Sequence, residues 1–136
     1  MPPNVQVEPW VPQQQVLSQA GAVLSHGGAG TTLGALAAGC PQVVFPLFAD
    51  QSDNARCVAK AGVGVALLDD SQGGPAALRS SRDGDEVRMR TSVQQVLSDP
   101  AYAARAAQVA ADMADLPTLL VVAAELTEGR SPLTEG

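Results

Sequence analysis

Aromatic residues, histidine and cysteine are all scarce in this chain of 136 residues. It contains one tryptophan, one tyrosine and two phenylalanines, so its core must consist mainly of valine, leucine and alanine. A single histidine excludes a metal site built from several histidines, and we expect neither a metal nor another cofactor. Two cysteines in small, apolar surroundings are more consistent with reduced thiols than with a disulfide framework.

Basic residues are also few, with 8 lysines and arginines against 14 acidic residues and a formal net charge of −6. Such a chain offers no positive field for nucleic acid or for an anionic membrane surface, so we expect neither as a partner. No apolar run reaches the length that spans a bilayer, and residues 1–4 lack the basic head and apolar core of a signal peptide. We therefore expect a cytoplasmic protein.

Short apolar runs alternate with alanine-rich stretches over the first half of the chain. The runs lie at residues 5–7, 22–25, 42–47 and 64–68, and the helical stretches between them lie at 13–20, 32–38 and 51–61. This alternation predicts an α/β fold, a Rossmann-like three-layer sandwich with a mainly parallel sheet. In such a sheet the loops that follow the strands share one edge, which is where ligands bind.

The length fits one domain, residues 1–136. Residues 69–86 are polar and rich in glycine, which predicts an exposed and mobile loop. Residues 87–128 have a helix-forming composition, and we expect helices there over 87–97, 100–114 and 119–126.

The most informative segment is the run His26-Gly27-Gly28-Ala29-Gly30-Thr31-Thr32, which directly follows an apolar run. Its glycines let the backbone approach an anion closely, and the amides and dipole of a following helix favour negative charge. His26 can add a donor from the end of the strand. The run therefore predicts a phosphate-binding turn, although a glycine-rich turn can also serve close packing alone.

Two further segments accompany this turn: Trp10-Val11-Pro12-Gln13 upstream, and a downstream stretch that runs from Gly39-Cys40-Pro41 to Ala49-Asp50-Gln51 and on to residue 55. Together with HGGAGTT and LGALAAG, they resemble the donor-binding, C-terminal half of nucleotide-sugar glycosyltransferases with the GT-B fold. The resemblance is strong over residues 5–70. Within that family, the chain is similar to bacterial family 1-type enzymes that attach deoxysugars to macrolides, other polyketides and antibiotics.

The resemblance assigns the nucleotide of the sugar donor to two of these segments. It implies that Trp10 stacks on the pyrimidine base, that main-chain groups of Val11 bond the base edge, and that Gln13 also contacts the nucleotide. It implies in addition that the diphosphate is bound by His26, Gly28, Ala29, Gly30 and Thr31. Each assignment has a structural alternative, because a tryptophan can close a core, a glutamine can cap a helix, and a lone histidine can be half-buried in a core.

Two other positions bear on the sugar donor. The resemblance implies that Asp50 and Gln51 bind hydroxyls of the donor sugar, although both can also cap the helix that follows them. Many relatives that use uridine diphosphate carry a glutamate for the ribose hydroxyls at the position of Gly34. Without that glutamate, a ribose loses a hydrogen bond to its 2′-hydroxyl, whereas a deoxyribose has no such hydroxyl and loses nothing. We therefore expect a dTDP-sugar rather than a UDP-sugar as donor.

The resemblance places the catalytic residues outside this chain. In the resembled enzymes, the His–Asp pair that deprotonates the acceptor belongs to an N-terminal domain, and nothing here matches that pair. We therefore expect an incomplete donor-binding domain that is not active alone and that meets its small-molecule acceptor through the missing N-terminal domain. An open sheet edge would permit a homo-oligomer.

The leading interpretation is the donor-binding part of a glycosyltransferase that transfers a deoxysugar from a nucleotide diphosphate sugar to a natural-product acceptor. One alternative is a separate donor-binding subunit that needs an acceptor-domain partner. Another is a non-catalytic nucleotide-binding module. A nucleotide-sugar epimerase of the same architecture is a weaker alternative, because it too needs catalytic carboxylates that this chain lacks.

Overall fold

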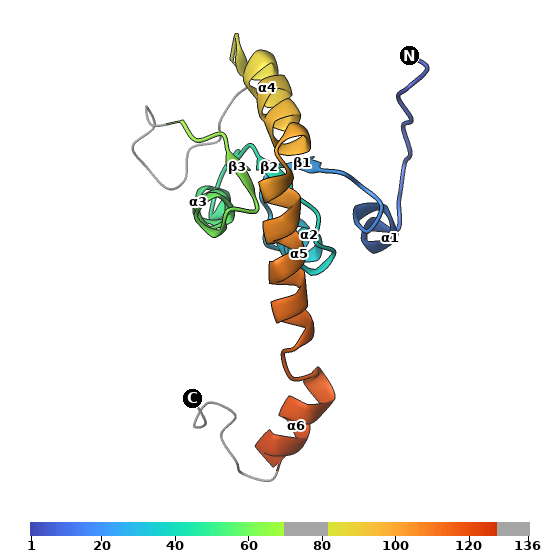
Figure 1. Cartoon of the computed structure of the whole chain (residues 1–136), viewed down its shortest axis with the longest axis vertical. Helices are drawn as coiled ribbons and strands as arrows, with labels where there is room; N and C mark the ends of the chain where they lie inside the picture. Colours follow the sequence, from blue (N-terminus) through green and yellow to red (C-terminus); the bar gives the residue numbers. More distant parts are fainter. Residues whose placement is uncertain (70–81, 128–136) are drawn as a thin grey trace.

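The computed structural model describes residues 1–69 and 82–127, which form three short strands and six helices (Figure 1). The elements alternate as the sequence predicts, and the last three are helices. In chain order they are α1 (Gln13–Leu17), β1 (Val23–Ser25), α2 (Ala29–Ala37), β2 (Gln42–Val44), α3 (Gln51–Ala61), β3 (Gly64–Ala66), α4 (Asp85–Ser98), α5 (Pro100–Ala114) and α6 (Leu119–Thr127).

The three described strands form one parallel sheet in the order β1-β2-β3. Leu24 pairs with Val43, and Val43 pairs with Val65. Every residue of the central strand β2 is buried, because helices cover both faces of the sheet. The predicted α/β fold with a parallel sheet is therefore confirmed.

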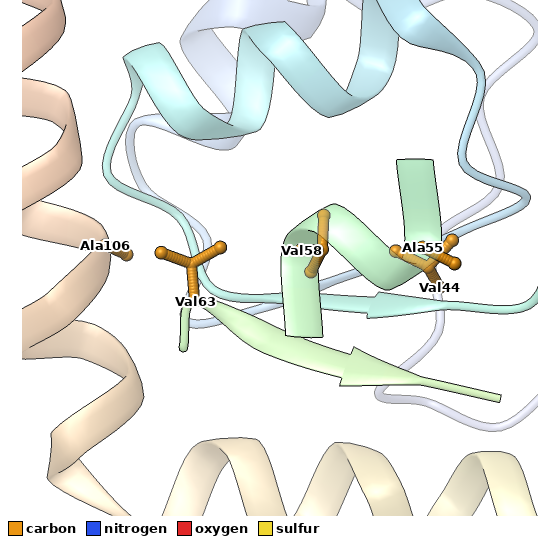
Figure 2. Packing of buried hydrophobic residues seen from close by; sticks show 5 residues of the cluster. All are labelled: Val44, Ala55, Val58, Val63 and Ala106. Carbon is orange, nitrogen blue, oxygen red and sulfur yellow. The ribbon is translucent and has the colours of Figure 1, made fainter. Parts of the chain in front are cut away.

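Successive residues of β2 point to opposite faces, and each face has its own core cluster. Val44 lies on the face covered by α3, where the buried cluster also contains residues of α5 and of the turn before β3. Figure 2 shows this cluster, which consists of Val44, Ala55, Val58, Val63 and Ala106. Val43 lies on the other face, in a cluster with Phe45, Leu67 and Val96 of α4. Helices, sheet and helix thus form three layers.

Helix α5 lies at the edge where the strands begin. Its Ala106 shares a cluster with Val63, which precedes β3 (Figure 2). Gly39, which precedes β2, also lies against Ala106, Ala107 and Ala110. The carboxyl ends of the strands therefore lie at the opposite edge of the sheet, and the loops predicted to bind the ligand follow them.

The strand predicted for residues 5–7 is not formed. These residues are coil, and the Val7 side chain is 67% exposed. A strand needs a neighbour for its backbone groups, and in the described part of the chain this segment pairs with none of the three strands. An alternation of only three residues, with Pro9 shortly after it, was too weak a signal to establish a strand.

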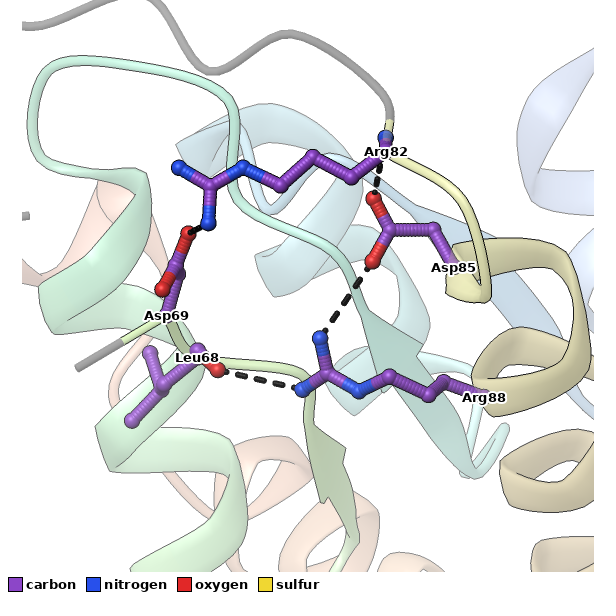
Figure 3. A network of polar contacts seen from close by, with 5 residues as sticks. All are labelled: Leu68, Asp69, Arg82, Asp85 and Arg88. Atoms are coloured by element: carbon purple, nitrogen blue, oxygen red, sulfur yellow. Dashed lines mark hydrogen bonds and ion pairs between the residues drawn. The ribbon is translucent and has the colours of Figure 1, made fainter. Parts of the chain in front are cut away.

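Helix α4 begins two residues earlier than predicted, at Asp85. The Asp85 carboxylate accepts bonds from the Arg82 backbone N–H at 2.9 Å and from the Arg88 guanidinium at 3.3 Å. Figure 3 shows how Arg88 also reaches the Leu68 carbonyl at 3.1 Å, while Arg82 pairs with Asp69 at 2.7 Å. This network joins the end of the strand region to the start of α4. Of the loop predicted for 69–86, residues 70–81 lie outside the described residues.

The C-terminal helix α6 projects from the end of α5 (Figure 1). None of its residues is buried, and the Leu120 side chain is 84% exposed. Among the described residues, no helix is both long enough and apolar enough to cross a bilayer.

Candidate functional site

The turn between β1 and α2 is held in one conformation by contacts on both sides. Gly27 has a φ of 87°, in the left-handed region that glycine tolerates and other residues rarely adopt. The Gly27 N–H donates to Ser25 Oγ at 3.2 Å, and the Gly27 carbonyl accepts from Asn54 Nδ2 at 2.9 Å. The backbone of the turn is therefore tied both to the end of β1 and to the first turns of α3.

The N-terminus of α2 presents backbone donors that no side chain caps. Gly28 is the N-cap residue, with extended backbone and no side-chain capping bond. The Thr32 N–H bonds the Gly28 carbonyl at 2.9 Å, so the amides of Ala29, Gly30 and Thr31 belong to the first turn, which has no earlier helical carbonyl to bond. Ala29 and Gly30 are exposed. With the helix dipole, this arrangement favours an anion.

The His26 side chain lies over Gly28. A methyl group at Gly28 would come within 2.7 Å of His26 Nε2, so the glycine leaves the space that the imidazole occupies. His26 is exposed, which rules out the alternative of a half-buried core histidine. Its ring nitrogen therefore lies beside the uncapped turn, where it can meet a bound anion.

The segment that contains Trp10 lies beside the same turn. Gln13 Nε2, at the start of α1, donates to Thr31 Oγ1 at 2.9 Å. Gln13 is therefore not a helix cap, and it connects α1 to the first turn of α2. Trp10 is 77% exposed, so it does not close a core, and Val11 is exposed as well. Both remain accessible, as a role in base binding requires.

Asp50 and Gln51 are neighbours in the chain, but their side chains have different surroundings. Asp50 is the N-cap residue of α3, but it makes no side-chain capping bond and is exposed. Gln51 is only 4% exposed, and its Oε1 accepts from the backbone N–H groups of Leu47 and Phe48, at 2.9 and 3.1 Å. The side-chain oxygen of Gln51 thus stabilises the loop before α3. Of the side-chain amide, only the nitrogen remains to donate a hydrogen bond to a sugar. Ala49, just before them, has a φ of 55°.

These contacts bring the loops after β1 and β2 together. A methyl group at Gly27 would lie 3.2 Å from the backbone carbonyl oxygen of Gln51, and Asn54 bonds the Gly27 carbonyl directly. Asn54 was not predictable from the sequence, because an asparagine on a helix has many partners available and this partner is 27 residues away. Asn54 thus joins the residues that the resemblance assigned to this edge.

Neither cysteine belongs to this arrangement of loops. Cys40 is buried between α2 and β2, and burial raises the pKa of its thiol, so it stays protonated at neutral pH. Cys57 is exposed on α3. In residues 1–69 and 82–127 there is no group of three or more histidine, cysteine, aspartate or glutamate residues that could hold a metal ion.

Comparisons with known proteins identify the family to which this fold belongs. A family described as "Erythromycin biosynthesis protein CIII-like, C-terminal domain" matches residues 1–128. The elloramycin glycosyltransferase ElmGT of Streptomyces olivaceus is 39% identical over 137 residues, which cover 100% of this chain and 31% of that protein.

Solved structures of similar proteins share the fold. The spinosyn rhamnosyltransferase SpnG matches with a TM-score of 0.79 and 29% identity, covering 93% of this chain and 32% of SpnG. SpnG complexed with thymidine diphosphate matches with a TM-score of 0.73 and 30% identity, over 86% and 29% of the two chains. The glycosyltransferase VinC in complex with dTDP matches with a TM-score of 0.77 and 26% identity, over 94% and 29%.

The chain spans about a third of the length of these relatives. The family match covers nearly the whole chain, and the relatives are antibiotic and spinosyn glycosyltransferases. The chain therefore belongs to the family of EryCIII-like C-terminal domains of antibiotic-pathway glycosyltransferases.

Proposed function

We propose that this chain binds the nucleotide diphosphate of an activated deoxysugar, as the donor-binding part of a glycosyltransferase that acts on a natural-product acceptor. The observation that carries the proposal is the uncapped N-terminus of α2 with His26 beside it. A diphosphate supplies the negative charge that this turn favours. Two structural neighbours were solved with thymidine diphosphate, which supports the same ligand class here.

In this proposal the nucleotide lies across two elements. Trp10 stacks on the base, and main-chain groups of Val11 bond the base edge, because both residues are exposed and precede Gln13, which bonds the first turn of α2. Gln13 fixes their place through its bond to Thr31. The diphosphate meets His26 and the amides of Gly28 to Thr31.

The donor sugar then lies beyond the diphosphate, next to the loop after β2. Asp50 accepts hydrogen bonds from its hydroxyls, and the Gln51 amide nitrogen donates to one of them. The exposure of Asp50 supports its part, and the engaged Oε1 of Gln51 limits that residue to donation. The negative charge that develops on the leaving diphosphate is stabilised by the same amides that bind it.

Thymidine diphosphate is the proposed nucleotide because α2 has no carboxylate where the ribose is expected. Gly34 lies one turn after Thr31, on the side of α2 that faces α1: a methyl group there would meet Leu17 Cδ1 at 3.5 Å. The ribose bound near Trp10 and Thr31 therefore finds no acceptor at this position for a 2′-hydroxyl.

The chain covers only part of its relatives' length, and we propose that transfer needs an acceptor-binding domain in addition to this one. Isothermal titration of this chain with dTDP and, in parallel, with UDP tests the donor site itself. Tighter binding of dTDP supports the proposal. Equal binding of both supports a nucleotide-binding module without the proposed preference, and no binding of either contradicts a complete donor site in this chain.

Replacing His26 with alanine is expected to weaken dTDP binding by about 1–3 kcal/mol, the contribution of one hydrogen bond to a charged group. The fold should be unaffected, because the imidazole is exposed. Calorimetric affinities of the two proteins, together with their midpoints of urea unfolding, measure both quantities. An unchanged affinity would remove His26 from the site.

Replacing Gly34 with glutamate is expected to strengthen UDP binding by about 1 kcal/mol and to leave dTDP binding nearly unchanged. The Cβ of the new side chain would be in ordinary contact with Leu17 Cδ1, at 3.5 Å, and its carboxylate can accept from a 2′-hydroxyl. Gly34→Gln is the matched control of similar size without charge. Equal effects of glutamate on UDP and dTDP would contradict the argument for deoxyribose.

A further inference from the structure

We propose that Asn54 is a positioning residue for the donor diphosphate: its side-chain amide holds the Gly27–Gly28 peptide so that the N–H, and not the carbonyl, faces the bound phosphate. This inference rests on the proposed function. It is carried by one contact, the 2.9 Å hydrogen bond from Asn54 Nδ2 to the Gly27 carbonyl oxygen.

The orientation follows from the planarity of the peptide. All peptides of the described chain are trans, and in a trans peptide the C=O and the following N–H point in opposite directions. With the Gly27 oxygen drawn toward α3, the Gly28 N–H must point away from α3. Gly28 caps α2, so this amide joins the uncapped amides of the first turn.

Nothing else in the turn fixes this peptide as directly. The Gly27 N–H bonds Ser25 Oγ, but that bond fixes the peptide before Gly27 and not the one after it. Glycine on both sides lets the Gly27–Gly28 peptide rotate with little steric cost. A rotated peptide would present its carbonyl oxygen to the phosphate, and two negative groups would face each other.

Asn54 is itself held firmly. It lies in the first turns of α3, where its backbone N–H bonds the Asp50 carbonyl at 3.1 Å. The next residue, Ala55, is fully buried against the sheet, so the helix cannot shift. Asn54 bonds the loop after β1 while Gln51, on the same helix, bonds the loop after β2. The start of α3 thus sets the conformation of both ligand-binding loops.

Asn54→Leu replaces the side-chain amide, which donates to Gly27, by an apolar group of similar volume. Asn54→Asp replaces the same amide by a carboxylate of the same shape, which cannot donate. Both variants are expected to bind dTDP about tenfold or more weakly, while the weak binding of thymidine, which has no phosphate, stays the same. NMR titration of the ¹⁵N-labelled chain measures both affinities and follows the Gly28 amide. In the wild type this amide signal should move downfield with dTDP, and in Asn54→Leu it should not.

Asp53→Asn is the matched control, because Asp53 lies next to Asn54 and, within the described part of the chain, its carboxylate pairs with the exposed Arg56 alone. It should bind dTDP within about twofold of the wild type. If Asn54→Leu and Asn54→Asp bind dTDP like the wild type, or if they lose thymidine and dTDP to the same extent, the positioning role is wrong. If the wild type itself fails to bind dTDP, the proposed function falls, and the inference with it.

Discussion

Replacing Gly27 with alanine is expected to lower the free energy of unfolding by about 3 kcal/mol and to reduce dTDP binding below detection. Two costs add at this position. The φ of 87° places an alanine in a conformation that costs roughly 1–2 kcal/mol, and the new methyl carbon would lie 2.5 Å from Val44 Cγ1 in the core. The turn must move to relieve this contact, and it then breaks the bond from Asn54.

Urea unfolding followed by circular dichroism gives the stability, and calorimetry gives the affinity. Gly30→Ala is the matched control, because Gly30 lies in the same run but has no atom within 4 Å of its added methyl group. In the first turn of a helix, alanine should stabilise by up to about 1 kcal/mol. Equal stabilities of Gly27→Ala and Gly30→Ala would mean that steric contacts at Gly27 do not determine the conformation of the turn.

The sheet was predictable because its central strand is buried on both faces. The apolar run at 42–47 marks a central strand irrespective of what surrounds it, and β2 is indeed buried throughout. The only feature that predicted a strand at 5–7 was an alternation of apolar and polar residues over three positions. Whether such a segment becomes a strand depends on a neighbouring strand, which is a property of distant parts of the chain and not of the run itself.

The candidate site was predictable only as a place in the fold. Glycines at 27, 28 and 30 indicated a turn that approaches an anion, and the structure has that turn at the carboxyl edge of the sheet. The exposure of Trp10 and His26 was not predictable, because both residue types occur in cores and on surfaces. Only their surroundings in the folded chain decide between the two.

Long-range side-chain bonds were the part that sequence reasoning missed. Gln51 was expected to bind sugar, but its side-chain oxygen accepts hydrogen bonds from the backbone N–H groups of Leu47 and Phe48. Asn54 was not singled out at all, although it bonds the phosphate-binding turn. Amide side chains donate and accept equally well, so their residue type does not say which partner they take.

A steric contact at Gly64 has a second large effect, on the stability of the fold. Replacing Gly64 with alanine is expected to lower the free energy of unfolding by at least about 4 kcal/mol, a large part of the roughly 5–15 kcal/mol that stabilises a typical domain. Gly64 begins β3 and pairs with Gln42 of the central strand. An added methyl carbon would lie 1.9 Å from the Gln42 carbonyl oxygen and 2.9 Å from Val58 Cγ1.

The Gln42 carbonyl oxygen belongs to the backbone of β2, so it cannot move aside as the end of a flexible side chain could. Moving β3 away from β2 would break the bond from the Gln42 N–H to the Val63 carbonyl, 3.0 Å long, and would open the cluster around Val58. Gly34→Ala is the control, because its methyl group meets only Leu17 Cδ1 at 3.5 Å and should be neutral or slightly stabilising in a helix. Thermal unfolding by circular dichroism compares the two. A Gly64→Ala protein as stable as the wild type would mean that β2 and β3 are further apart than the pairing here requires.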